Sequence, residues 1–245
     1  MDETRSIRLE ARPAAIDIEV ATTAVIVVDM QNDFGAKGGM FDRAGIDISV
    51  IQRVVGPIAK VLVSARKAGI KIVYLKMGFR PDLSDLGPTD APNRARHLGM
   101  NVGQTVRAPD GRESRILIRD TWNTEIIPEL RSQGGDIVMY KHRYSGFYQT
   151  DLHATLKQFG VKHLILTGCT TSVCVESTVR DAMYHDYSCV LLSDCIAEPI
   201  GHGLSRSNHE ASLLTMEVLF GWVSSSGAFT KALDAQAGAV AHAFP

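Results

Sequence analysis

Short apolar runs rich in β-branched residues alternate along this chain with longer segments whose apolar positions recur at helical spacing. Residues 24–28 form a continuous apolar run, typical of a parallel strand that is buried on both faces of a sheet. Five later runs have the same character. The pattern therefore predicts strands at 24–28, 70–75, 137–140, 161–166, 189–192 and 220–223.

The segments between these runs predict helices. Residues 50–68 carry helical periodicity and stop at Gly69, and Val175, Val179 and Ala182 recur on one face of another helix. Strands that alternate with helices form βαβ units with right-handed crossovers, so we expect an α/β fold around a mostly parallel sheet. The predicted helices cover 50–68, 122–130, 151–159, the segment after Cys174, a segment from Ser205 or Ser207 to 219, and 228–235.

Two segments do not follow this alternation. Residues 1–20 are expected to enter the fold as an extended segment. Residues 76–115 are long and rich in Gly, Pro, Asp and Arg, and a structureless loop of that length is improbable inside a compact domain. We expect short helical turns there, in an active-site wall or an oligomer arm. No linker or repeat divides the chain, so 1–245 is predicted to be one domain with its core at about 20–235.

Composition and charge narrow the function classes. The chain has 245 residues, 22% of them charged, with a formal net charge of -1, which gives no electrostatic reason to expect nucleic acid or an anionic membrane as partner. Neither a signal-peptide pattern nor an apolar run of membrane-spanning length occurs, so a cytoplasmic protein is expected. The four cysteines form no C-x-x-C pair and the histidines no zinc-type spacing, so we expect neither a disulfide framework nor a metal.

Three reactive side chains follow three predicted strands. Asp29 follows 24–28, Lys141 follows 137–140, and Cys174 lies in a Gly-, Thr- and Ser-rich turn after 161–166. Ligands of open parallel sheets bind at the carboxyl ends of the strands, so the three groups are expected to share one crevice. There Asp29 can take the thiol proton and later return it, Lys141 can favour the thiolate, and Cys174 can attack a carbonyl.

Each residue also has a simpler interpretation. Cys174, in the first turn of a helix whose N–H groups favour a thiolate, is equally consistent with a buried inert thiol. Asp29 is consistent with a helix cap, and Lys141 with a charge on a solvated loop beside His142 and Arg143. The three strand-end placements taken together favour a catalytic site.

These residues occur in motifs that resemble the isochorismatase-like cysteine hydrolases. The motifs are VVDMQNDF at 27–34, Lys141, and GCTTSVC at 168–174, and the resemblance covers roughly residues 20–235. It implies a Rossmann-like three-layer α/β/α sandwich and a catalytic set of Asp29, Lys141 and Cys174. It also implies a cis peptide bond at Cys169–Thr170, with the N–H groups of Thr170 and Cys174 forming an oxyanion hole, and it implies no cofactor.

Shorter motifs bear on the substrate. KHRYSGF at 141–147, CVEST at 174–178 and FGWV at 220–223 resemble the ureidoacrylate amidohydrolases, whereas GFRPDLSDL at 78–86 is similar to biuret hydrolases. Met77 departs from the ureidoacrylate pattern, which places a polar residue near this point. The metal-binding Asp-x-His-x-His pattern of nicotinamidases is missing from 76–80, and the cysteine argues against vinyl ether hydrolysis of the isochorismate type.

The sequence therefore predicts a cysteine amidohydrolase that cleaves a C–N bond of a small ureide or amide through a thioester, releasing ammonia or carbamate. Biuret or triuret hydrolysis, vinyl ether hydrolysis and a non-enzymatic interaction module are the alternatives. The family resemblance implies a homodimer or homotetramer. Candidate substrate contacts are Gln31, which is also expected to orient the Asp29 loop, together with Phe34, Phe79, Arg80 and Tyr144.

Overall fold

A parallel sheet forms the centre of the computed structural model, which describes residues 5–200 and 208–241. Every predicted strand is present, and all five neighbouring pairs of the six-stranded sheet run parallel. The strands are β3 (Thr23–Val28), β4 (Lys71–Met77), β7 (Ile137–Lys141), β8 (His163–Cys169), β9 (Ser188–Ala197) and β10 (Gly221–Ser224), in the spatial order β10-β9-β8-β3-β4-β7.

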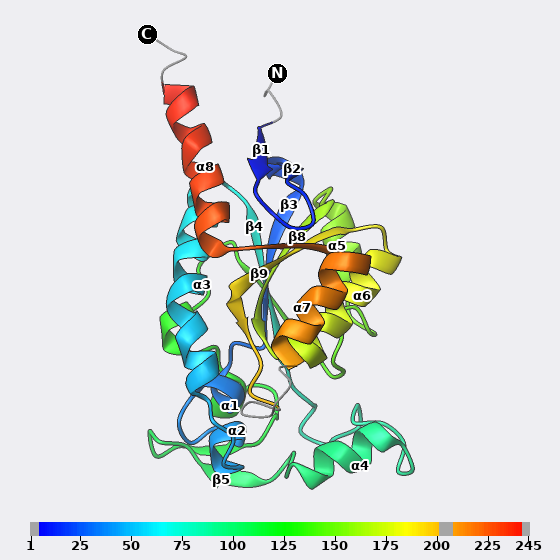
Figure 1. The fold of residues 1–245 in the computed structure, drawn as a ribbon. Coiled ribbons are helices and arrows are strands. Elements are labelled where there is room, and N and C mark those ends of the chain that lie inside the picture. Colours follow the sequence, from blue (N-terminus) through cyan, green and yellow to red (C-terminus); the bar gives the residue numbers. More distant parts are fainter. Residues whose placement is uncertain (1–4, 201–207, 242–245) are drawn as a thin grey trace.

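Helices cover both faces of this sheet (Figure 1). One face carries α3 (Ser49–Lys67) and α8 (Ser226–Ala241), and the other carries α5 (Leu152–Gln158), α6 (Glu176–Tyr184) and α7 (Asn208–Leu219). Strand β3 is buried along its whole length because it has a core on each side: Val25 and Val27 pack toward α3, and Ile26 packs toward α6. The predicted three-layer α/β/α sandwich is therefore confirmed.

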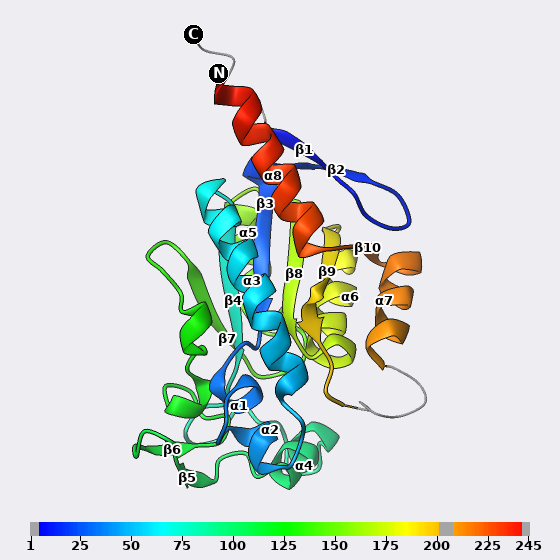
Figure 2. The same cartoon turned by 60° about the vertical axis from the view of Figure 1, so that its left-hand side comes forward.

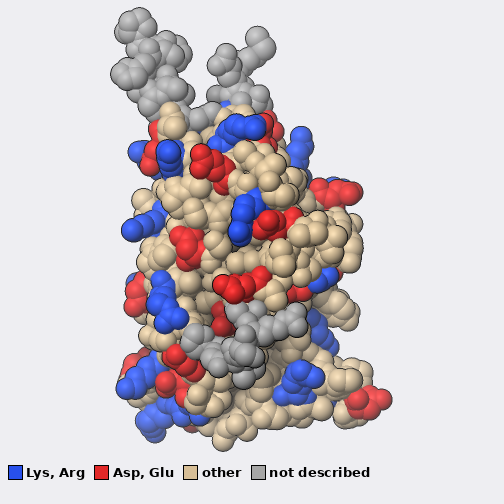
Figure 3. All heavy atoms as spheres, in the orientation of Figure 1, with Lys and Arg blue, Asp and Glu red and all other residues tan. Residues whose placement is uncertain are grey.

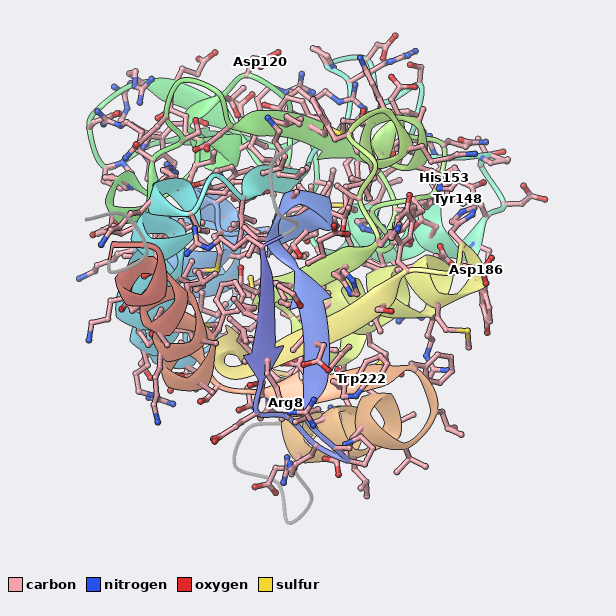
Figure 4. The ribbon with its side chains drawn as sticks, turned by 90° about the horizontal axis from the view of Figure 1, so that it is seen from above. Arg8, Asp120, Tyr148, His153, Asp186 and Trp222 are labelled. Carbon is pink, nitrogen blue, oxygen red and sulfur yellow. The ribbon has the colours of Figure 1, made fainter. Side chains whose placement is uncertain are left out.

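A short hairpin precedes the sheet. Strands β1 (Ser6–Leu9) and β2 (Ile16–Glu19) pair antiparallel, and their outward side chains include Arg8 and Asp17, whose charged atoms are 2.8 Å apart. Figure 4, which looks down from the hairpin end, shows these strands above the sheet, with Trp222 of β10 and Asp120 on opposite sides of the molecule. The segment predicted as extended is thus a hairpin that covers the amino end of the sheet.

The opposite end of the sheet, where the strands finish, is covered by the segment that the strand–helix alternation left unassigned (Figure 2). As expected, 76–115 is not structureless: it contains α4 (Pro92–Gly99) and a small hairpin of β5 (Thr105–Arg107) and β6 (Glu113–Arg115). Two short helices, α1 (Asn32–Gly35) and α2 (Met40–Arg43), lie beside them. These elements form the walls around the carboxyl ends of the strands.

The predicted helix at 122–130 is wrong. The segment contains two separate 3₁₀ turns, Trp122–Thr124 and Pro128–Leu130, with an extended stretch between them. That stretch is held by the Asp29 loop, because Ile126 pairs with Gln31 and the Ile127 N–H donates to the Met30 carbonyl at 3.1 Å. A proline at the start of the second turn, which favours an extended residue before it, works in the same direction.

Other boundaries shift. Strand β8 begins two residues later than predicted and continues to Cys169, and β9 continues to Ala197. Helix α8 is longer than the predicted 228–235. The predicted starts of α7, Ser205 and Ser207, lie outside the described residues.

In the described part of the chain, no helix combines the length and apolar character needed to cross a membrane. Positive and negative side chains are interspersed over the face in Figure 3, in line with the near-zero net charge.

Candidate active site

The strand order places Asp29 and the Cys174 turn on either side of one break in the sheet. Counted along the chain, the six parallel strands lie in the order 3-2-1-4-5-6, the Rossmann arrangement, whose direction reverses between β3 and β8. Asp29 follows β3, Cys174 follows β8, and Lys141 is the last residue of β7. Such a reversal leaves a crevice at the carboxyl ends of the strands, where the reactive side chains meet.

Asp29 and Lys141 form a buried ion pair. Their Oδ2 and Nζ atoms are 2.8 Å apart, and the side chains are 1% and 0% exposed. Asp29 has a φ of 54°, an uncommon left-handed backbone conformation that turns the chain out of β3, and its N–H donates to the Leu75 carbonyl at 2.8 Å. Lys141 Nζ also lies 3.7 Å from Met77 Sδ and 3.3 Å from the Arg143 carbonyl oxygen. The ammonium is therefore held from several sides.

Cys174 lies in an unusual turn rather than in a regular α-helix. The chain leaves β8 through the cis peptide bond Cys169–Thr170, forms a π-helical turn over Thr171–Val175 and then enters α6. The Val175 N–H donates to the Thr170 carbonyl at 3.1 Å, and the Thr178 hydroxyl donates to the Cys174 carbonyl at 2.7 Å. These bonds fix the backbone around the thiol.

A buried carboxylate supports the same turn, and no pattern in the sequence predicted it. Glu198, just after β9, is 7% exposed. Its Oε2 accepts the Ser172 N–H at 2.8 Å and also the Ser172 hydroxyl, while its Oε1 accepts the Ile200 N–H at 2.9 Å. Glu198 thereby ties the turn that carries Cys174 to the segment that follows the neighbouring strand.

Burial governs the ionisation of the three groups. It raises the pKa of the Cys174 thiol well above its ordinary value, and nearby Lys141 offsets only part of that rise. It also raises the pKa of Asp29, against the attraction of Lys141. For Lys141, burial alone would lower the pKa. Attraction to Asp29 and Cys174 together outweighs burial, so the pKa of Lys141 is raised. Burial therefore favours a neutral thiol beside a charged lysine and a carboxylate that is a stronger base than usual, in line with the expectation that Asp29 takes the thiol proton.

A cavity of about 450 Å³ opens onto these groups. Of the predicted residues, Asp29, Cys174, Thr170, Phe34 and Tyr144 line it. Most of the remaining wall is apolar and comes from α2, α4 and the ends of strands. These further lining residues are Met40, Phe41, Met77, Arg96, His97, Met100, Leu117, Cys169, Val173 and Ile200.

Three predicted substrate contacts do not line this cavity. Gln31 is fully buried, and both ends of its side-chain amide bind the backbone of Met77. The amide NH₂ donates to the Met77 carbonyl at 2.9 Å, and the amide oxygen accepts the Met77 N–H at 2.8 Å. Phe79 is fully buried and packs edge-on against His97, with ring centroids 5.2 Å apart. Arg80 lies in a separate groove on the outside, because the chain turns away there with the Arg80 N–H bound to Asp85 at 2.9 Å.

Helix α4 supplies pocket residues that the sequence analysis missed. His97 is 1% exposed, and burial lowers its pKa, so its ring is neutral. Its Nδ1 lies 2.7 Å from the Asn93 carbonyl, which can only accept, so Nδ1 carries the proton. The ring also lies 5.8 Å from that of Tyr144. Only the position of α4 within 76–115, predicted as an active-site wall, pointed toward these residues.

Asp33 fixes two walls of the cavity. Its carboxylate accepts the N–H of Met40 at 2.9 Å and of Leu117 at 2.7 Å, and a further hydrogen bond from the Asn123 amide. Burial raises the pKa of Asp33 to about 7 against these donors. The same motif therefore provides a reactive carboxylate, Asp29, and a structural one. Within residues 5–200 and 208–241, no cluster of three or more His, Cys, Asp or Glu side chains is arranged to hold a metal.

Comparison with known proteins agrees with this geometry. The model of the isochorismatase domain matches residues 23–228. Ureidoacrylate amidohydrolase RutB of Methylorubrum extorquens is 38% identical over 229 residues, covering 94% of this chain and 90% of that protein. RutB of Variovorax paradoxus is 39% identical over 223 residues, covering 91% and 86%.

Solved structures are similar over most of the chain. A cysteine hydrolase from Pseudomonas syringae pv. phaseolicola is 31% identical with a TM-score of 0.75, covering 96% of this chain and all of that one. N-carbamoylsarcosine amidase from Thermoplasma acidophilum is 27% identical with a TM-score of 0.61, covering 84% and 96%. This chain therefore belongs to the isochorismatase family of hydrolases, as its motifs predicted.

Proposed function

We propose that this protein is a cysteine-dependent amidohydrolase that cleaves a C–N bond of a small ureide of the ureidoacrylate type. The observation that carries the proposal is the buried Lys141–Asp29 ion pair beside the Cys174 thiol, at the base of a largely apolar cavity. The relatives named ureidoacrylate amidohydrolase, which this chain matches over nine-tenths of its length, support the substrate class.

In the first half of the proposed reaction, the substrate carbonyl carbon lies beside the Cys174 sulfur. Asp29 accepts the thiol proton while the sulfur attacks, and Lys141 stabilises the negative charge that forms in this buried site. The N–H groups of Thr170 and Cys174 hold the oxyanion. The C–N bond then breaks as Asp29 returns the proton to the leaving nitrogen, which leaves a thioester on Cys174.

In the second half, water replaces the leaving group. The water oxygen attacks the thioester carbon while Asp29 takes a proton from the water. The C–S bond then breaks, and Asp29 returns the proton to the Cys174 sulfur. The acid released from a ureide is a carbamic acid, which decomposes to ammonia and carbon dioxide. Because burial favours the neutral thiol, its proton passes to Asp29 as the sulfur attacks rather than before.

The segment that suggested biuret does not favour that substrate. Phe79 supports His97 from behind and Arg80 lies outside the cavity, so neither residue is available to a biuret molecule at Cys174. The cysteine nucleophile likewise gives no support to vinyl ether hydrolysis, and the intact set of three reactive groups gives none to a non-enzymatic module.

The test is ammonia release by the purified protein from ureidoacrylate, biuret, triuret, N-carbamoyl amino acids and nicotinamide. The Cys174→Ala variant serves as the blank. We expect a strong thiol-dependent signal with ureidoacrylate. A thiol-dependent signal with biuret or triuret alone would remove the proposed substrate class, and silence with every compound would remove the proposed activity.

A further inference from the structure

One lining residue gives the cavity a permanent positive charge. Among the described lining residues, Arg96 of α4 is the only Lys or Arg, and most of the others are apolar. Lys141, at the base of the site, is fully buried and already paired with Asp29 at 2.8 Å. A substrate that carries a charge would therefore meet Arg96 as the available cation.

Arg96 is not neutralised by the protein in the described part of the chain. No Asp or Glu of residues 5–200 or 208–241 forms an ion pair with it, whereas Arg119 is paired with Asp85 at 2.7 Å. Its neighbour on α4, Arg94, bonds the Gly87 carbonyl at 3.2 Å and does not line the cavity. Arg96 is exposed and lines the cavity, so its guanidinium is available for a bidentate contact with a carboxylate.

The side chains around Arg96 favour a carboxylate as its ligand. His97 is neutral and adds no charge, and Tyr144, whose pKa is raised by burial, keeps a hydroxyl proton to donate. The positive charge of Arg96 extends to this hydroxyl, since it lowers the pKa of Tyr144 in opposition to burial. A carboxylate between these groups would receive donors from two walls, while the aliphatic part of the substrate contacts methionine and phenylalanine side chains.

We propose that Arg96 binds the carboxylate of the substrate and makes the enzyme selective for ureido acids over neutral ureides. This inference rests on the proposed function and deepens it. The ureide carbonyl lies at Cys174 and the acid group lies toward α4, which covers the carboxyl ends of the strands (Figure 1). A ureido acid of the ureidoacrylate type has both groups, whereas biuret has no carboxylate for Arg96.

The test compares ureidoacrylate with its primary amide, which has nearly the same shape but no charge. In Arg96→Gln we expect KM for the acid to rise about 10- to 100-fold, the range for loss of a charge-assisted contact. We expect kcat/KM for the amide to stay within about twofold, which also shows that the variant folds. Arg96→Lys keeps the charge and loses the bidentate geometry. We expect its KM for the acid to lie between those of the wild type and Arg96→Gln.

Arg80→Gln is the matched control, since it removes an arginine outside the cavity and is expected to leave both substrates unaffected. An unchanged ratio of acid to amide in Arg96→Gln would overturn the assignment, as would an equal change in Arg80→Gln. In either case the proposed ureide hydrolysis itself would stand.

A second readout does not depend on turnover. Butyrate and butyramide have nearly the same shape and only butyrate is charged, and either compound in the cavity would slow alkylation of Cys174 by iodoacetamide. We expect butyrate to protect the wild-type thiol at lower concentration than butyramide, and Arg96→Gln to abolish that difference. Equal protection by both compounds in the wild type would contradict a carboxylate site, even if no ureide were cleaved.

Discussion

Three ionisable side chains share a site with little access to solvent, and burial changes the proton affinity of each. The pKa of Asp29 and that of Cys174 are both raised by burial, while Lys141 stays charged through its attraction to Asp29. A carboxylate with a raised pKa is a better proton acceptor near neutral pH. In the proposed reaction, the ion pair therefore supplies a base for a thiol that is too weak an acid to ionise alone.

This ionisation predicts the acid limb of the pH profile. Asp29 must be ionised to accept the thiol proton, so kcat/KM falls as the pH falls through the Asp29 pKa. Because that pKa is raised from 3.8, we expect the midpoint of the fall to lie above 3.8. The measurement is kcat/KM against pH, with far-UV circular dichroism at each pH to show that the fold persists. A midpoint at or below 3.8 in folded protein would contradict the assignment.

The positions of the three candidate catalytic residues could be predicted from the sequence because each follows an apolar run typical of a buried strand. The same argument could not predict the positions of Arg96 and Glu198. Arg96 lies on α4, a short polar helix without a continuous apolar face, and the role of Glu198 depends on a contact across 26 positions of the chain. Gln31 was adjacent to the correct residue, but its amide turned out to bind the backbone of Met77.

At the scale of elements, the turn over Thr171–Val175 is held from two sides. Its backbone is bonded to Thr170 and Thr178, and Glu198 accepts both donors of Ser172. Gly168, just before the turn, has a φ of 110°, and a Cβ there would lie 2.0 Å from the Val28 carbonyl oxygen. Close approach of β8 to β3 therefore requires glycine at this point and sets the distance between the thiol and Asp29.

This arrangement makes Glu198 a positioning residue. In Glu198→Gln an amide NH₂ replaces one carboxylate oxygen and faces an N–H donor, so the turn should lose its fixed position. We expect kcat to fall about 10-fold, because small displacements of a nucleophile are costly, with KM changed by less than about twofold. The alkylation rate of Cys174 should change as well. Glu129→Gln, at an exposed position, is the control, and equal behaviour of the two variants would exclude this role.

Element boundaries were less predictable than element types. The segment at 122–130 has helical composition, yet the Asp29 loop pairs with it and keeps its centre extended. Strand β8 continues beyond its apolar run through Thr167 and Gly168, because β3 and β9 pair with it on both sides. In both cases a tertiary contact overrides the local preference.

At the scale of the whole molecule, the Rossmann strand order explains why distant parts of the chain meet. The reversal between β3 and β8 leaves room for the Asp29 loop and the Cys174 turn, and the walls from 76–115 close the space above them. The alternation of strands and helices was sufficient to predict this architecture and the end of the sheet that carries the site. It was not sufficient for the cavity walls, which have no repeating pattern.

The family resemblance also predicts a homo-oligomer. Four large apolar side chains on neighbouring helices α6 and α7 are more than half exposed: Tyr184, Leu214, Val218 and Leu219. Light scattering after size-exclusion chromatography should give a mass of two or four chains of 26.7 kDa each. If this face is used, Leu214→Asp should reduce the mass, whereas Val63→Asp, at an isolated exposed position on α3, should not. A wild-type mass of one chain would refute the expectation.

The most direct test of the account is whether Asp29, Lys141 and Cys174 act as one catalytic unit. The measurement is kcat for ureidoacrylate in Asp29→Ala, Lys141→Ala, Cys174→Ala and the double variant Asp29→Ala/Cys174→Ala. Each single change should lower kcat by about 10³-fold or more, and the double variant should lose no more than Cys174→Ala alone, because members of a unit are not additive. Full activity in Cys174→Ala, or losses that multiply in the double variant, would contradict it.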